Sequence, residues 1–324
     1  MSLDLGRIVS RSFSITWRHR WLWLLGVFGG GGVGARANYN YSPNVPQGDA
    51  IGRFVSQHMA LLVAGLAVLA AIVLISILLA CVAVPAATWA ALQLDAGREV
   101  GLRQAWGEGT KRFWRYLRLV LLRGLLSLLI AVAAAVLAVL GFLVYAAGGN
   151  ATLLLLVPLG LLLFVAFIGL LLVVSFGLTW SDRLLVILGV GAMDSIRAGW
   201  WLFRHNKLNT VVLSVVLGVI NFGASVALLF AASLASFPGI SLLVLYFTRP
   251  GVSSGLAIAG TVWVTLVGGG VFLLGAGFLG AFTQVAYALA ARDLSISNRL
   301  QALPEVIGWD GSNAPAVPLG LAPA

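Results

Sequence analysis

The sequence has very little charge for its length. Only 9% of its 324 residues are Asp, Glu, Lys or Arg, and 60% are hydrophobic, whereas a soluble domain carries roughly 25% charged residues. A folded chain of this composition could not cover its surface with polar side chains in water. The composition therefore excludes a soluble enzyme, a disordered protein and a coiled coil. It predicts an all-α integral membrane protein that crosses the membrane several times.

Groups that perform chemistry are also scarce. The single cysteine, Cys81, excludes an intrachain disulfide and a thiol redox pair. The sequence contains no HExxH, no CxxC and no nucleophile beside a base, and the glycines at 29–32 lack the Lys-Ser/Thr of a phosphate-binding loop. We therefore expect no enzymatic activity, no cofactor and no metal site. Acidic residues beside arginines, such as Asp182 beside Arg183, are expected to neutralise each other, although paired carboxylates could instead hold a divalent ion for lipid phosphoryl chemistry.

Positive charge exceeds negative charge, with a formal net charge of +10. The basic residues border the apolar runs, which favours contact with anionic lipid headgroups over binding to nucleic acid. Eighteen of the 20 cations are arginine, and Ala, Leu, Val and Gly are abundant. This usage is typical of a GC-rich bacterial genome, so we expect the protein in a bacterial cytoplasmic (inner) membrane.

Long runs without a charged residue locate the membrane spans. A helix needs about 20 residues to cross a hydrocarbon layer about 30 Å thick. The 58-residue run Gly124–Ser181 therefore holds two spans, separated at Gly148-Gly149-Asn150. Pro85 is expected to kink the second span near its end, and Pro238-Gly239 together with Arg249-Pro250-Gly251 is expected to separate the last two. The six predicted spans cover residues 18–35, 58–83, 121–147, 152–180, 209–236 and 254–281.

The first of these segments has a second interpretation. It is short, it contains four consecutive glycines, and Ala35-Arg36-Ala37 resembles the cleavage site of a signal peptide. The stretch before it is an amphipathic helix rather than a short basic region, which favours a retained span. The basic residues then set the orientation, because 17 cations lie on one side and only Arg36, Arg53 and Arg249 on the other. This asymmetry predicts three hairpins with both termini in the cytoplasm.

Three basic segments resemble one another, which predicts an internal threefold repeat. In each, an aromatic residue followed by Arg stands just before an apolar run, and the spacing is 97 and then 89 residues. We expect an interfacial amphipathic helix before each hairpin, at residues 3–19, 100–117 and 192–206. The histidines in two of the segments are interpreted as interfacial, with headgroup binding or pH sensing as the alternative. The candidate lipid-interface residues are Trp17, Arg18, His19, Trp114, Arg115, Phe203, Arg204 and His205.

The third basic segment carries a family resemblance. Residues 183–208, RLLVILGVGAMDSIRAGWWLFRHNKL, resemble uncharacterised bacterial multi-pass membrane proteins that are distantly similar to the membrane domain of some glycerophosphodiester phosphodiesterases. The N-terminal stretch LGRIVSR with WRHRWLWLLG, and the stretch YALAARDL at 287–294, fit the same group. The resemblance covers most of residues 1–295. It implies an architecture and no activity, because the chemistry of those phosphodiesterases belongs to a separate soluble barrel.

Few polar residues lie inside the predicted spans, and none there is charged away from the ends. Asn221, Thr283 and Gln284 are the candidate intramembrane polar residues, each expected to hydrogen-bond between helices rather than bind a substrate. The glycines between 268 and 280 predict a small-residue face for close approach of another helix, within the chain or in a homo-oligomer or protein partner. After the membrane domain at 1–299, residues 300–324 are rich in proline and predict a disordered cytoplasmic tail.

These features predict a non-catalytic membrane protein that acts as a scaffold, binding or regulatory subunit, with anionic lipids at its cytoplasmic face. The alternative is a transporter or channel for a small uncharged or lipid-like substrate, which the repeats favour. The lack of a charged residue near the predicted midplane argues against ion-coupled transport. A lipid-modifying enzyme that uses the interfacial histidines and carboxylates is a third, less favoured interpretation.

Overall fold

The computed structural model describes residues 4–29, 48–249 and 253–297. Within these ranges the chain is helical and contains no strand. Five helical segments are long and apolar enough to cross a membrane: Val63–Asp95, Phe113–Gly141, Leu162–Leu188, Lys207–Thr248 and Ser254–Ser295. The prediction of an all-helical chain with several such segments is confirmed. Of the predicted first span, residues 18–35, the structure describes the part up to Gly29, which includes the eight-residue helix α2 (Leu22–Gly29).

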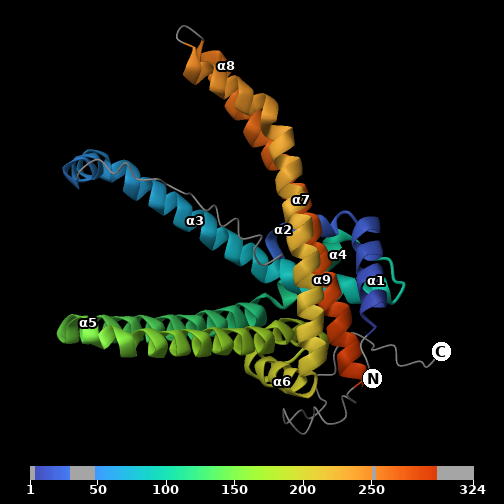
Figure 1. Cartoon of the computed structure of the whole chain (residues 1–324). Helices are drawn as coiled ribbons and strands as arrows, with labels where there is room; N and C mark the ends of the chain where they lie inside the picture. The colour runs from blue at the N-terminus through green and yellow to red at the C-terminus, as the bar shows by residue number, and fades with distance from the viewer. Residues whose placement is uncertain (1–3, 30–47, 250–252, 298–324) are drawn as a thin grey trace.

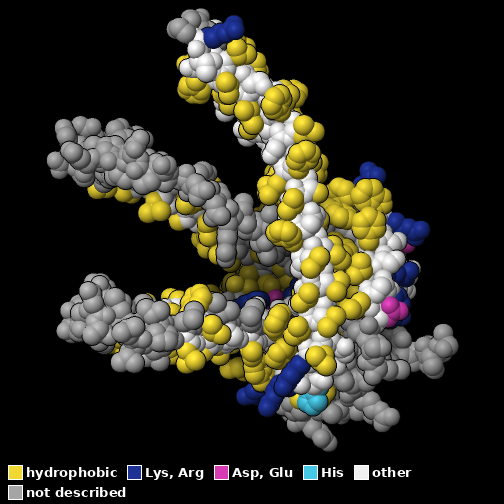
Figure 2. All heavy atoms as spheres, viewed as in Figure 1, with side chains coloured by type: hydrophobic (Ala, Val, Ile, Leu, Met, Phe, Trp, Pro, Cys, Tyr) yellow, Lys and Arg dark blue, Asp and Glu magenta, His cyan; other side chains and the backbone are white. Residues whose placement is uncertain are grey.

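The long helices extend from a common body as three arms (Figure 1). The arms are α3 (Gly48–Asp95), α5 (Phe113–Leu188), and α7 (Lys207–Thr248) paired with α8 (Ser254–Trp263), the π-helical turn η1 (Val264–Gly268) and α9 (Gly269–Ser297). Figure 2 shows hydrophobic side chains along the arms and most visible charged groups on the body. Leucine, valine and phenylalanine side chains stand exposed along the arms, as expected of surfaces that contact lipid.

Helix α5 turns back on itself. Its 76 residues would measure about 114 Å if straight, yet its two ends are in contact. Arg115 near the start donates to the carbonyl oxygen of Gly189 just after the end at 2.6 Å, and Arg123 donates to Asp182 at 3.1 Å. The chain must therefore reverse direction between these residues, and Figure 1 shows the two halves lying next to each other.

Helices α3 and α7 each continue through an internal proline, where the sequence predicted a kink at Pro85 and a separation of spans at Pro238. Helix α3 continues through Pro85 to Asp95, and α7 continues through Pro238 to Thr248. The expectation that Pro238-Gly239 begins the separation of the last two spans was wrong. The reason is packing, because Gly239 faces Gly260 on α8 so closely that neither residue has room for a side chain. The helix pair stays in contact past the proline, which costs one backbone hydrogen bond but keeps the interface.

Three short helices repeat the same relation to the arms. Helix α4 (Leu102–Lys111) packs against the end of α3, and α6 (Ala192–His205) packs against the end of α5. Helix α1 (Leu5–Arg18), followed by α2, packs against the end of α9. Helices α4 and α6 thus pack on the long helix that precedes them in the chain, whereas α1 packs on the last long helix, α9. Their buried faces and the ends of the long helices make one hydrophobic core around the fully buried Trp180.

Glycine permits these helices to approach closely. A Cβ atom at Gly26 of α2 would overlap the carbonyl oxygen of Gly277 on α9, and one at Gly277 would lie 2.6 Å from the carbonyl oxygen of Trp23. On α6, a Cβ at Gly199 would lie 3.0 Å from the carbonyl oxygen of Gly177. Gly277 belongs to the predicted small-residue face, and it is covered here from within the chain.

An ion-pair network joins α1, α3 and α9. The Asp95 carboxylate at the end of α3 accepts from Arg11 of α1 at 2.8 Å and from Arg292 of α9. Arg7 pairs with Asp293 at 2.6 Å. The Asp95 side chain is only 11% exposed, so the network holds α1 to the body more strongly than a surface ion pair would.

Replacing Asp95 by asparagine is expected to destabilise the protein by about 1–3 kcal/mol, because two guanidinium groups lose their shared carboxylate. Thermal unfolding in detergent, followed by tryptophan fluorescence, measures this effect. The matched control is Asp194→Asn. Asp194 pairs with Arg197 of the same helix at 3.7 Å, and the two side chains are 40% and 62% exposed, so its loss should cost about 0.5 kcal/mol or less. Equal effects of the two variants would show that the network does not hold α1.

Candidate functional site

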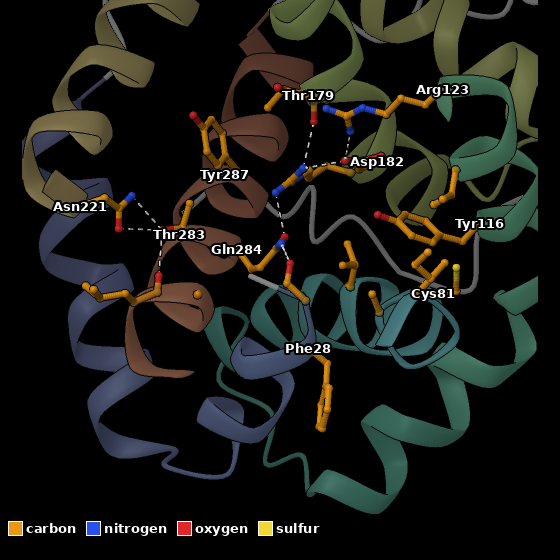
Figure 3. A pocket seen from close by; sticks show the side chains of 18 of the residues that line it. Phe28, Cys81, Tyr116, Arg123, Thr179, Asp182, Asn221, Thr283, Gln284 and Tyr287 are labelled. Carbon is orange, nitrogen blue, oxygen red and sulfur yellow. Dashed lines mark hydrogen bonds and ion pairs between the residues drawn. The ribbon is translucent and has the colours of Figure 1, made fainter. Parts of the chain in front are cut away.

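All the long helices meet at one pocket in the body, which we call the central pocket (Figure 3). Its volume is about 450 Å³, within the size range of small-molecule sites. It is lined by Phe28, Gly29, Ile77, Ala80, Cys81, Val84, Tyr116, Val120, Arg123, Thr179, Asp182, Arg183, Asn221, Ser225, Leu279, Gly280, Thr283, Gln284 and Tyr287. These residues come from α2, α3, both ends of α5, α7 and α9, so the pocket depends on the packing of all these helices.

A buried charge cluster forms one wall of the central pocket. The Asp182 carboxylate accepts from Arg123 and from Arg183, each at 3.1 Å. Asp182 and Arg183 are 6% and 5% exposed, whereas the Arg123 side chain is 37% exposed. Two positive groups thus share one negative group in a poorly solvated place. Removing a charged side chain there lowers the free energy of unfolding far more than removing one at a surface.

Gln284 connects this cluster to α2. Its side-chain oxygen accepts from Arg183 at 2.7 Å, and its side-chain nitrogen donates to the carbonyl oxygen of Gly29. Gly29 is the last residue of α2, so its carbonyl oxygen has no partner within that helix. The amide of Gln284 supplies the partner, and in Figure 3 it lies between the charge cluster and the Asn221–Thr283 pair.

The other predicted intramembrane polar residues bind each other across the same pocket. Asn221 of α7 donates to the Thr283 hydroxyl of α9 at 3.0 Å, and that hydroxyl also contacts the Leu279 carbonyl oxygen of its own helix at 2.8 Å. Asn221, Thr283 and Gln284 therefore form interhelical hydrogen bonds, as expected, and all three also line the central pocket.

The rest of the pocket wall is largely apolar and aromatic. Phe28, Ile77 and Val84 contribute apolar surface from α2 and α3. On the opposite side the guanidinium carbon of Arg183 lies 5.1 Å from the centre of the Tyr287 ring, a distance at which the ring face attracts a cation. The pocket thus combines a charged wall with an apolar one.

The predicted lipid-interface residues lie apart from this pocket. Trp17 and Trp114 are 52% and 69% exposed on α1 and α5, and Arg18 and Arg204 are also exposed. Phe203 is buried instead, stacked on Phe176 with ring centres 6.3 Å apart. Arg115 donates to the Gly189 carbonyl oxygen across the two ends of α5, whereas His19 and His205 contact carbonyl oxygens of their own helices.

Sequence reasoning missed the charge cluster. It placed Arg123, Asp182 and Arg183 at the outer ends of spans and treated Asp182 and Arg183 as a surface pair. Helix α5 continues beyond these residues on both sides, to Phe113 and to Leu188, and its packing buries Asp182 and Arg183. The available signal was their position, since Arg123 and Asp182 directly flank the uncharged run 124–181. A hairpin with that run between them brings the two residues together.

The described residues contain no group of three or more His, Cys, Asp or Glu side chains that could hold a metal ion. The carboxylate nearest the pocket, Asp182, faces arginines rather than another carboxylate. Comparisons with protein-family models, curated proteins and solved structures find no match to this chain. The central pocket, and no relative, is therefore the basis for a functional assignment.

Proposed function

We propose that this chain is a multi-pass membrane protein that binds a ligand in the central pocket, without catalysing a reaction. The observation that carries the proposal is the composition of the pocket, to which α2, α3, both ends of α5, α7 and α9 all contribute. A binding site formed where the spans converge is the arrangement expected of a membrane protein that recognises a molecule within the bilayer. A scaffold that only presents an outer surface would not need this convergence of polar groups.

The proposal includes six spans arranged as three hairpins in a bacterial inner membrane, with cytoplasmic termini. Residues 18–35 form the first span, and α1, α4 and α6 lie along the cytoplasmic interface with Trp17, Trp114 and their neighbouring arginines at the headgroups. The excess of cations on one side of the predicted spans supports this orientation. A distant relation to the membrane domain of glycerophosphodiester phosphodiesterases remains part of the same proposal.

Transport of the bound ligand is a second candidate. It is favoured by the repeated relation between each short helix and the end of a long helix, because repeated units around a shared site are the usual construction of transporters. The buried Asp182 and Arg183 also line the central pocket, so charged groups are available at the proposed site.

Filling the pocket is expected to remove its ligand. Ala80 of α3 lines the pocket, and Ala80→Phe places a ring inside it. Native mass spectrometry of the intact protein, purified in mild detergent from its expression membranes, measures the small molecules that remain bound. We expect occupancy to fall about tenfold or more, equivalent to about 1.4 kcal/mol of binding free energy.

The control is Ala133→Phe, because Ala133 is exposed on the outer part of α5 and lies outside the pocket. Its bound molecules should match those of the unmodified protein. If both variants carried the same bound molecules at the same occupancy, or if the unmodified protein carried none when saturated with membrane extract, the pocket would not be a binding site.

A further inference from the structure

We infer that the ligand of the central pocket is an amphiphile with an oxyanion group, phosphate or carboxylate, and that Arg183 and Arg123 bind this group. The inference rests on the proposed function, which supplies a ligand but not its chemistry. The evidence lies in the charge balance of the pocket, in an unused donor of Arg183 and in the division of the wall into charged and apolar parts.

The central pocket carries a net positive charge. Arg123 and Arg183 contribute two positive groups and Asp182 one negative group, and the other lining residues are uncharged types. A site with one excess guanidinium attracts an anion, and the poor solvation of the buried Arg183 strengthens the interaction. A neutral ligand would leave that charge without compensation.

Arg183 has a donor without a partner. One terminal nitrogen donates to Asp182 and to the Thr179 carbonyl oxygen, each at 3.1 Å, and the other donates to Gln284 at 2.7 Å. Its Nε atom is buried and has no hydrogen-bond partner among the residues that the structure describes. A buried donor without an acceptor is costly, and an oxyanion is the acceptor that matches the guanidinium edge in geometry and charge.

The remaining wall suits a hydrocarbon chain. Phe28, Ile77, Val84, Val120 and Leu279 line the pocket beside the charged groups. Figure 2 shows charged atoms at the base of the hollow between the arms α3 and α5, whose visible sides are hydrophobic. An amphiphile can therefore place its anionic group on the arginines while its chain lies among apolar side chains. A small hydrophilic anion would make no favourable contacts with the apolar part of the wall.

Asp182 is then a competitor of the ligand. Its carboxylate occupies donors of both arginines, so an incoming oxyanion shares or displaces it. Removing the carboxylate should tighten anion binding, and removing either guanidinium should weaken it. If the Asp182 variant binds the anion more tightly and the arginine variants bind it more weakly, the residues act directly on the ligand. Damage to the fold would instead weaken binding in every variant.

The test titrates the intact protein in neutral detergent with phosphatidylglycerol and measures the first bound lipid by native mass spectrometry, with diacylglycerol, which has no oxyanion, in parallel. Arg183→Gln and Arg123→Gln should each weaken phosphatidylglycerol binding about tenfold, as expected for the loss of a hydrogen bond to a charged group. Asp182→Asn should strengthen it by a similar factor. Arg197→Gln, which removes one exposed charge from α6, should change it less than twofold, and diacylglycerol binding should change in none of the variants.

Arg123→Gln keeps the buried Arg183–Asp182 pair, so it remains informative if Arg183→Gln does not fold. Inorganic phosphate at millimolar concentration is the second probe, and it should not displace the lipid. Displacement of the lipid by inorganic phosphate would contradict an amphiphilic ligand and indicate that the pocket binds a free anion. Equal binding by Arg123→Gln and Arg197→Gln, or weaker binding by folded Asp182→Asn, would overturn the anionic site. If a neutral molecule were bound to the unmodified protein and to Arg123→Gln but not to Ala80→Phe, the anionic site would also be contradicted. The proposed function would still stand.

Discussion

Replacing Gly26 by leucine is expected to prevent assembly of the body. Helix α2 crosses α9 at Gly26 and Gly277, and a Cβ atom at position 26 would overlap backbone atoms of α9. Because the obstacle is backbone, no change of side-chain conformation relieves it, and the helices must separate. Separation exposes Leu22 and Leu25, which are fully buried. The expected loss exceeds about 3 kcal/mol, above the usual cost of overpacking, from a total of only about 5–15 kcal/mol.

The measurement is the yield of monodisperse protein by size-exclusion chromatography, with the thermal midpoint of the recovered fraction. Gly65→Leu is the matched control, because a Cβ atom at Gly65 of α3 would meet nothing within 4 Å. The control should purify like the unmodified protein. Recovery of Gly26→Leu at the control level and midpoint would contradict the close crossing of α2 and α9.

Asp182→Asn is expected to destabilise the protein more than either Asp95→Asn or Asp194→Asn. It leaves Arg183, whose side chain is 7% exposed, and Arg123 without a carboxylate. Breaking a buried ion pair from one side costs roughly 3–5 kcal/mol. Asp95→Asn should cost less, because its partner Arg11 is 54% exposed, and Asp194→Asn should cost least.

Thermal unfolding of the three variants in one detergent tests this order. The double variant Asp182→Asn with Arg183→Gln should recover part of the loss, since it removes a buried charge that no longer has a partner. Phosphatidylglycerol should raise the midpoint of Asp182→Asn more than that of the unmodified protein. A destabilisation by Asp182→Asn no larger than that by Asp194→Asn would mean that the charge cluster is solvated.

Composition and hydropathy were sufficient to predict long apolar helices, because each such helix is a local property of the sequence. The meeting of Asn221 with Thr283 was not predictable, because 62 residues separate them and the partner of an intramembrane polar group depends on helix rotation. The burial of Phe203 has the same origin: the aromatic–Arg pattern predicts an interface, and only the packing of α6 on α5 decides which side the ring faces.

The charge cluster shows why charged residues are a poor guide to where a membrane-spanning helix ends. Counting uncharged residues stops a span at its first charge, so Arg123 and Asp182 marked boundaries. A helix does not end at a charge, and α5 extends beyond both residues into the body. Charges that flank one long apolar run become neighbours when the run folds back, and the arginines then compensate the buried charge of Asp182.

The most direct test of ligand binding in the central pocket is a cryo-EM map of the intact protein in nanodiscs that contain phosphatidylglycerol. We predict six spans around the central pocket and elongated density in it, with its polar end within hydrogen-bond distance of Arg183 and Arg123. A map in which the arms close over an empty pocket, with Arg183 satisfied by protein atoms alone, would contradict this prediction.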